Sequence, residues 1–234
     1  FGDYYQELEK KIKEALVKNI DETSWRIDGE NYWLWNFINE EVALYVVNKK
    51  RGSEVPTKIL GNQEGKTIVS DRFSAYNEFV KKSHCKQQIC WSHILRNSKE
   101  LAEHYQEAKY IHKRLKYIYD KASDGEKRGL LLHWVDLIAS RNYKSSEVYK
   151  FVKSICRNHR DDLFRFVDNL EIDSTNNRAE RGLRHAVVIR KISNGSRSKD
   201  GAEVTANLLS VLQTAKLQSN NYMNFMGDLL QKGK

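Results

Sequence analysis

The sequence has few residues that interrupt or cross-link a chain, with one proline and three cysteines among 234 residues. Three cysteines cannot form a framework of paired disulfides, which excludes the disulfide-rich secreted class and favours a reducing compartment. No run of apolar residues approaches the ~20 that a membrane helix needs. We therefore expect a protein of the cytoplasm that has no membrane partner.

Basic residues outnumber acidic ones, 40 Lys and Arg against 31 Asp and Glu, and the net charge is +9. The hydrophobic share of 40% is enough to bury one core, or a core with one insertion. A basic surface favours a phosphate backbone as partner because binding releases counterions, although many basic proteins have no polyanionic partner. A cluster of acidic residues against this background would indicate a metal site that acts on nucleic acid.

The first ninety residues favour a mixed sheet. Leu16–Ile20 is a short apolar run, and the dipeptide Asp28-Gly29 is a hairpin signal. Strands rich in aromatic and β-branched residues follow at Tyr32–Ile38 and Val42–Val47, which predicts an antiparallel meander. A helix, a strand, a helix and a strand then alternate over residues 53–60, 67–70, 73–82 and 87–90. This order predicts an α/β fold around a mixed sheet.

The middle of the chain shows no convincing strand. Periodic apolar residues predict helices over residues 92–105, 108–122, 127–140 and 146–169, which resemble a helical insertion. A loop over 171–177 then opens a helix that contains Glu180, and a last helix is expected from Ala202 to Gln218. The helical block therefore separates two parts of the α/β region.

Asp21 and Asp71 each follow directly on a short apolar run, and Glu180 lies on a later helix. Neighbouring strands that end in Asp can place both carboxylates at one edge of a sheet, where Mg²⁺ finds the oxygen ligands it prefers. Each residue also has an ordinary explanation. Asp often forms turns after strands, and Glu180 stands at capping distance from Asn177. The patterns alone leave both interpretations open.

A resemblance extends across several of these segments in one order. The blocks resemble those of bacterial transposases of the insertion sequence 66 family, and they lie at residues 21–29, 32–35, 70–77, 90–96, 174–184, 190–191, 195–198 and 209–214. One departure is His185, where the family usually has proline. Because the order is kept along the chain, the set is far more specific than any single motif.

The resemblance implies a DDE transposase with a ribonuclease-H-like core, a mixed five-stranded sheet flanked by helices. It implies that the core spans residues 1–96 and 173–234, with an all-helical insertion at 97–172 before the last acid. Asp21, Asp71 and Glu180 become the catalytic acids and the ligands of two Mg²⁺ ions, for which Mn²⁺ can substitute. Family members also carry an upstream DNA-binding and coiled-coil region, so recognition of transposon ends is expected to lie there.

The implied activity is metal-dependent cleavage of DNA at transposon ends and strand transfer into target DNA. A homodimer is expected because two ends must be joined, and the bacterial cytoplasm is the expected location. One alternative is a ribonuclease-H-like nuclease without strand transfer. Another is a catalytically inactive module that binds DNA or assists assembly.

Two further groups of residues accompany the acids. A basic stretch is predicted to grip DNA phosphates, although a solvated helix face would look the same; it contains Arg178, Arg181, Arg184, Arg190, Lys191 and Arg197. Cys90 and His93 stand one helical turn apart, and we expect a structural pairing beside the sheet. A zinc site at this pair is the less favoured interpretation, because a close pairing of cysteines is missing.

Overall fold

The computed structural model describes residues 2–218, 224, 225 and 227, so the end of the expected core segment 173–234 lies partly outside the described residues. The chain divides into two compact units. The first comprises residues 1–86 and 177–234, and the second comprises residues 87–176. We describe each unit by itself.

A mixed sheet organises the first unit. Strands β1 (Val17–Ile27), β2 (Glu30–Ile38) and β3 (Ala43–Asn48) form an antiparallel meander, and β1 also pairs in parallel with β4 (Thr67–Ser70). The strand order is β3-β2-β1-β4-β5, where β5 spans Lys86–Ile89. This topology confirms the predicted α/β class with a mixed five-stranded sheet.

The β1–β2 hairpin forms where the sequence predicts it. Asp28 and Gly29 both have positive φ, at 50° and 78°. A two-residue hairpin turn of type I′ requires positive φ at both positions. Beyond the turn, alternate residues of β2 face opposite sides of the sheet. Trp35 and Phe37 therefore enter one hydrophobic core, while Leu34 and Ile38 enter the other.

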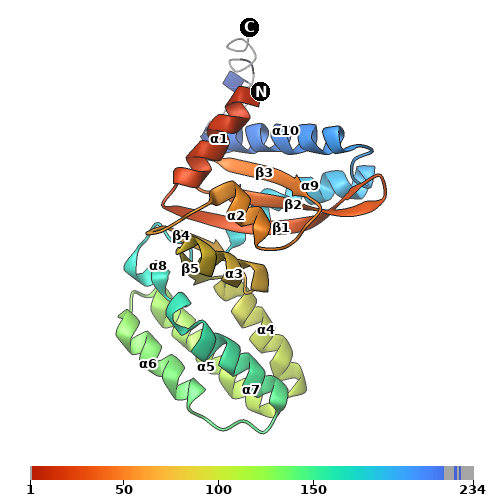
Figure 1. The fold of residues 1–234 in the computed structure, drawn as a ribbon. Helices are drawn as coiled ribbons and strands as arrows, with labels where there is room; N and C mark the ends of the chain where they lie inside the picture. The colour runs from red at the N-terminus through yellow and green to blue at the C-terminus, as the bar shows by residue number, and fades with distance from the viewer. Residues whose placement is uncertain (1, 219–223, 226, 228–234) are drawn as a thin grey trace. The chain divides into compact units, whose positions relative to one another are not determined.

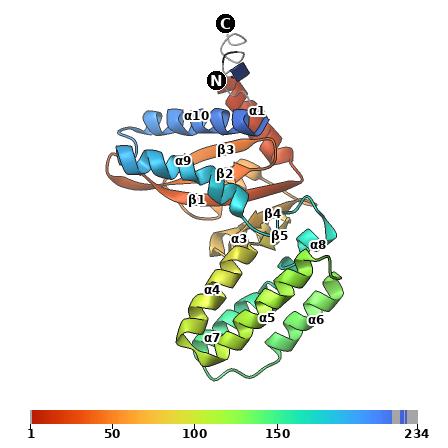
Figure 2. The same cartoon turned by 180° about the vertical axis from the view of Figure 1, so that it is seen from behind.

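Helices cover both faces of this sheet. On one face lie α1 (Gly2–Glu14), α2 (Glu54–Leu60) and α3 (Ser74–Ser83), as Figure 1 shows. On the other lie α9 (Asn177–Ser193) and α10 (Lys199–Gln218), which Figure 2 shows in front of the strands. Helix α10 also protects the edge strand: the backbone N–H groups of Ala43 and Tyr45 donate to the hydroxyls of Thr214 and Ser210, at 3.0 and 2.8 Å.

The second unit consists mainly of helices around its own core. They are α4 (Trp91–His104), α5 (Gln106–Ser123), α6 (Arg128–Ala139), α7 (Ser146–Val152), a π-helix (Lys153–Asn158), a 3₁₀-helix (Arg160–Asp162) and α8 (Arg165–Asp168). The single helix predicted over 146–169 is therefore wrong. One physical reason lies at Leu163, whose carbonyl accepts hydrogen bonds from the side chains of Trp91 and Gln88, at 2.6 and 3.0 Å. The chain leaves helical geometry at the next residue, Phe164 (φ −131°, ψ 31°).

Two predicted boundaries are corrected. The strand before Asp21 does not end there, because β1 stays paired with β2 from Asp21 to Ile27. The last helix begins at Lys199 instead of Ala202, since the Ser198 hydroxyl accepts the backbone N–H of Gly201 at 3.1 Å and caps the first turn. Among the described residues, no helix is both long and apolar enough to cross a membrane.

Candidate active site

The pairing of β1 with β4 sets the relative position of the first two acids. The two strands are parallel, and Asn19 pairs with Val69 in their register. Continuing this register by two residues brings Asp71, which follows β4 directly, beside Asp21 in the middle of β1. Only Asp71 therefore occupies the strand-end position expected for both residues.

Backbone groups hold both carboxylates. The N–H of Phe73 donates to Asp71 Oδ1 at 2.8 Å, which turns the side chain back over the start of α3. The N–H of Glu22 donates to Asp21 Oδ1 at 2.9 Å. These two hydrogen bonds orient the carboxylates, whose oxygens are the kind of ligand that a hard cation prefers.

The first turns of α9 carry Glu180 onto the same face of the sheet as Asp21. Asn36 stands opposite Asp21 in the β1–β2 ladder, and its side-chain amide donates to the carbonyl of Ala179 at 3.1 Å. The Tyr45 hydroxyl donates to the carbonyl of Gly182 at 2.7 Å. Two buried strand residues thus anchor the backbone on either side of Glu180.

Gly182 allows this close approach. A Cβ atom at that position would lie 2.4 Å from Asn36 Nδ2 and 3.2 Å from the Tyr45 hydroxyl. Any larger residue would push α9 away from β2, because both neighbours are fully or almost fully buried. The glycine therefore contributes to the position of Glu180.

The surroundings of Asp21 disfavour its charged form. The pKa of Asp21 is raised to about 7, mainly because the side chain is buried and next because of the charge of Glu22. The hydrogen bond from the backbone N–H of Glu22 lowers this pKa, and the charges of Asp71 and Glu180 raise it. A cation bound by these carboxylates would offset the negative charge that raises the pKa of Asp21. Their oxygens are hard donors, so the set fits Mg²⁺ or Mn²⁺.

Glu22 points to the opposite face of β1 and was not predicted as part of the site. Its side chain is 3% exposed, accepts a hydrogen bond from Arg51 Nε at 2.9 Å and contacts the Tyr76 hydroxyl. Burial raises the pKa of Glu22, while the hydrogen bonds from Tyr76 and Arg51 oppose the rise. The acid next to Asp21 is therefore a structural support beneath it.

Arg51 connects this support to the segment that follows Asp71. Its guanidinium carbon lies 4.3 Å from the ring centre of Trp33 and 4.3 Å from that of Phe73. The backbone N–H of Phe73 also donates to Asp71. The contact between Arg51 and the Phe73 ring therefore helps to fix the segment from Asp71 to Phe73. A sequence signal for this contact is absent, since Arg51 and Glu22 are 29 residues apart.

Comparison with known proteins decides the family. A sequence model described as the Transposase IS66 family matches residues 2–204. The chain belongs to this family. It is accordingly a DDE transposase, an enzyme that cleaves DNA and transfers its strands.

Solved structures with some likeness to the transposase include the integrase catalytic core domain of HTLV-2 in complex with magnesium. Its dimeric form is 17% identical, covers 41% of this chain and 81% of its own, and has a TM-score of 0.26. The trimeric form is 15% identical over 41% and 80% of the two chains, also with a TM-score of 0.26. Among curated proteins, none matches the chain.

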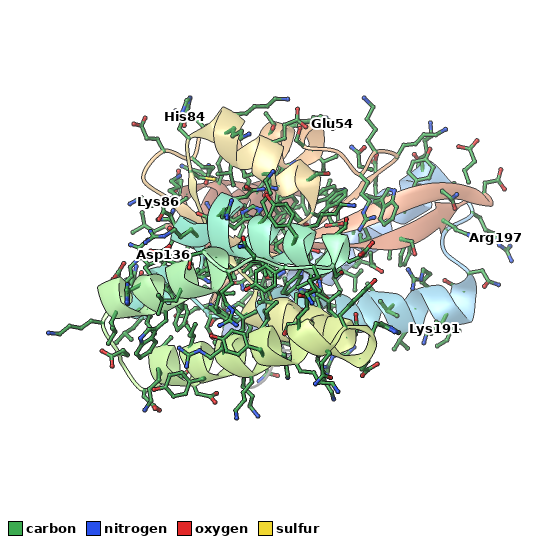
Figure 3. All side chains as sticks on the ribbon, turned by 90° about the horizontal axis from the view of Figure 1, so that it is seen from below. Glu54, His84, Lys86, Asp136, Lys191 and Arg197 are labelled. Carbon is green, nitrogen blue, oxygen red and sulfur yellow. The ribbon has the colours of Figure 1, made fainter. Side chains whose placement is uncertain are left out.

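The basic residues around Glu180 in the transposase differ in their surroundings. Arg178 pairs with Glu40 at 3.3 Å, and Arg190 donates to the Thr23 hydroxyl at 3.0 Å and to the backbone of Ser24. Arg190 thus ties the end of α9 to β1. The remaining four predicted DNA-binding residues are exposed: Arg181, Arg184, Lys191 and Arg197. Figure 3 shows Lys191 and Arg197 extending outward from the end of α9 and the loop after it.

The loop that carries Arg197 is attached to the β1–β2 hairpin. Ser196 donates its N–H to the carbonyl of Arg26 at 2.8 Å and accepts the N–H of Asp28 at 2.9 Å. Gly195 has a φ of 109°, and a Cβ there would lie 2.2 Å from the Arg26 carbonyl oxygen. The loop is therefore fixed in place by main-chain pairing that requires glycine.

Cys90 and His93 lie together at the start of α4 in the second unit. Cys90 Sγ accepts the backbone N–H of Asn176 at 3.0 Å and lies 2.9 Å from the Ser92 hydroxyl. Burial raises the pKa of Cys90, but hydrogen bonds from His93, Ser92 and the backbone outweigh it and lower the pKa overall. These contacts join the two ends of the helical unit.

Proposed function

We propose that Asp21, Asp71 and Glu180 form the catalytic centre of this transposase and are the ligands of two divalent cations. The observation that carries the proposal is the placement of the acids: the β1–β4 register brings Asp71 beside Asp21, and α9 carries Glu180 to the face of β1 on which Asp21 lies. Carboxylates close together in a partly buried site disfavour one another's charged form, and a bound cation offsets this effect.

Magnesium is the proposed ion, with manganese as a substitute, because the three proposed ligands offer carboxylate oxygens alone. When bound, a pair of such ions supplies positive charge to the attacking and leaving oxygens of a phosphodiester. The chain itself supplies the arrangement. The Phe73 N–H orients Asp71, and Asn36 with Tyr45 fixes the helix that carries Glu180.

The proposed substrates are transposon-end DNA and target DNA in the bacterial cytoplasm. The exposed residues Arg181, Arg184, Lys191 and Arg197 would contact phosphates near the cleaved bond, and Arg178 and Arg190 would join them from their ion pair and hydrogen bonds. A second copy of the chain is the proposed partner, because joining two ends requires two catalytic centres. The Cys90–His93 pair is proposed as a structural contact.

A plasmid assay tests the proposed centre. Supercoiled plasmid with Mn²⁺ should be nicked by the wild type, and Asp21→Asn, Asp71→Asn and Glu180→Gln should each lower nicking by at least about 100-fold. The control is Glu64→Gln, which removes an exposed acid from a loop and should leave nicking unchanged. Nicking that survives in Asp71→Asn would contradict the proposal.

A strand-transfer assay separates the alternatives. A duplex with a free 3′-hydroxyl should be joined to plasmid by the wild type and by Glu64→Gln. Nicking without joining would support a nuclease that lacks strand transfer. DNA binding with neither reaction would support an inactive binding module.

A further inference from the structure

Helix α5 carries a strongly basic segment that has no part in the proposed catalytic centre. From Ala108 to Tyr119 the chain has no acidic residue and five basic or imidazole side chains: Lys109, His112, Lys113, Arg114 and Lys116. The helix buries a stripe at Ala108, Ile111, Leu115, Ile118 and Ala122. The three lysines point away from this stripe and are exposed, as their spacing on a helix requires.

Within the described part of the chain, no acidic side chain neutralises these lysines. Over residues 2–218, no carboxylate lies within ion-pair distance of Lys109, Lys113 or Lys116. Like charges on adjacent helical turns destabilise a helix in isolation. A stripe of three is therefore better explained by an anionic partner than by the stability of α5.

Helix α4 adds a fourth cation to this surface. The Ser98 hydroxyl lies 2.8 Å from His112 Nδ1, which joins α4 to α5 at this point. Burial lowers the pKa of His112, and the charges of Lys116 and Lys99 lower it further. Lys99 therefore lies near the stripe, and we call Lys99, Lys109, Lys113 and Lys116 together the α5 lysine face.

Two tyrosines accompany the lysines on α5. Tyr110 is 39% exposed and Tyr117 is 42% exposed. Arg141 lies 4.3 Å from the ring centre of Tyr110, and Arg114 lies 5.5 Å from that of Tyr117. Phenol hydroxyls and guanidinium groups beside lysines are the side chains that contact phosphate and sugar in protein–DNA interfaces.

We propose that the α5 lysine face binds the phosphate backbone of duplex DNA, an inference that rests on the proposed function because DNA is its substrate. From Lys109 to Lys116 the helix rises about 10 Å, at ~1.5 Å per residue. That length matches about three steps from phosphate to phosphate on one strand, at ~3.4 Å per step along the duplex axis. The face reads no base and so contributes affinity without sequence preference.

The test is the salt dependence of DNA binding by the full chain. The triple variant Lys109→Gln, Lys113→Gln, Lys116→Gln is compared with the wild type on a fluorescent duplex between ~0.05 and ~0.2 M salt. The slope of log K against log salt should become shallower by about 2 to 3, because each lost phosphate contact removes ~0.9. A thermal unfolding midpoint at or above that of the wild type would show that the variant is folded.

A matched control removes three other lysines of the same unit. Lys127→Gln, Lys150→Gln, Lys153→Gln takes away the same charge from exposed positions and should change the slope by less than about 1. The inference is overturned if the α5 variant keeps the wild-type slope, or if the control variant loses as much. Nicking by saturating protein at low salt should persist in the α5 variant. That separates failure here from failure of the catalytic centre, which Asp71→Asn reports.

Discussion

Arg51 Nε donates a hydrogen bond of 2.9 Å to the carboxylate of Glu22, whose side chain is only 3% exposed. The pair lies on the face of β1 opposite Asp21, and the guanidinium also stacks against Phe73, two residues after Asp71. The Arg51–Glu22 pair therefore supports the proposed catalytic residues from the opposite face of the sheet. It holds Asp71 without touching its carboxylate.

Arg51→Ala should destabilise the protein and weaken metal binding. The variant leaves the buried carboxylate of Glu22 without its cation. Because Arg51 is 44% exposed and solvent screens the pair, we expect the free energy of unfolding to fall by only about 1–3 kcal/mol. Urea denaturation measures this change. Arg51→Lys should restore only part of the loss, since an ammonium cannot stack as a plane between two rings. Full recovery of Mn²⁺ affinity by Arg51→Lys would show that charge alone matters.

The stability of the metal-free protein should fall as the pH rises from about 4 to about 7. Asp21 has a folded-state pKa of about 7 against an ordinary value of 3.8, so the folded state holds a proton that the unfolded state has lost. Stability from this group is therefore complete below pH 4 and lost as the pH rises to 7. Thermal unfolding in a chelating buffer across this range measures the change.

Asp21→Asn supplies the control for this pH dependence. Without the titrating group, the variant should be more stable than the wild type at pH 7 without metal, by about 2–4 kcal/mol. The two proteins should converge at pH 4, and added Mn²⁺ should stabilise the wild type alone. A parallel pH dependence in both proteins would assign the effect to another group.

Gly182→Ala should displace α9 and impair nicking. A Cβ atom would lie 2.4 Å from Asn36 Nδ2 inside a packed contact, so either the helix or Asn36 must move. Overpacking of this kind costs about 1–3 kcal/mol. Gly129→Ala is the matched control, because that glycine has open space around its Cβ position on α6. The control should keep both its stability and its nicking activity.

Chelator treatment should leave the Cys90–His93 contact intact. Cys90 Sγ already accepts a hydrogen bond from the backbone N–H of Asn176 and lies 2.9 Å from the Ser92 hydroxyl, so Cys90 has partners without a metal. Metal analysis of chelator-washed, refolded protein should find no zinc, and its unfolding midpoint should equal that of untreated protein. Stoichiometric zinc would identify the pair as part of a metal site.

Local patterns in the sequence predicted much of the fold. Asp28-Gly29 marked the hairpin because its turn needs positive φ, and Thr67–Ser70 was bounded by polar neighbours on both sides. The part of β1 after Ile20 lacks an apolar run in its sequence, because Asp21, Glu22, Thr23 and Ser24 are polar. They stay in the ladder only through pairing with β2, a partner that local reading does not supply.

The supports of the site were harder to predict than its acids. Asn36, Tyr45 and Gly182 act together only because α9 crosses strands far away in the chain. Arg51 and Glu22 are 29 residues apart in the sequence, and only the folded chain brings them into hydrogen-bond contact. The broken helix after Val152 was missed for a related reason, since the Leu163 carbonyl finds side-chain donors from the start of the same unit. Long-range contacts override local helix preference there.

The most direct test of the central claim is Mn²⁺ binding followed by electron paramagnetic resonance in the presence of duplex DNA. We expect two bound ions per wild-type chain, and fewer ions or at least about tenfold weaker binding in Asp71→Asn, while Glu64→Gln matches the wild type. Equal stoichiometry and affinity in Asp71→Asn and wild type would contradict a metal centre built from Asp21, Asp71 and Glu180.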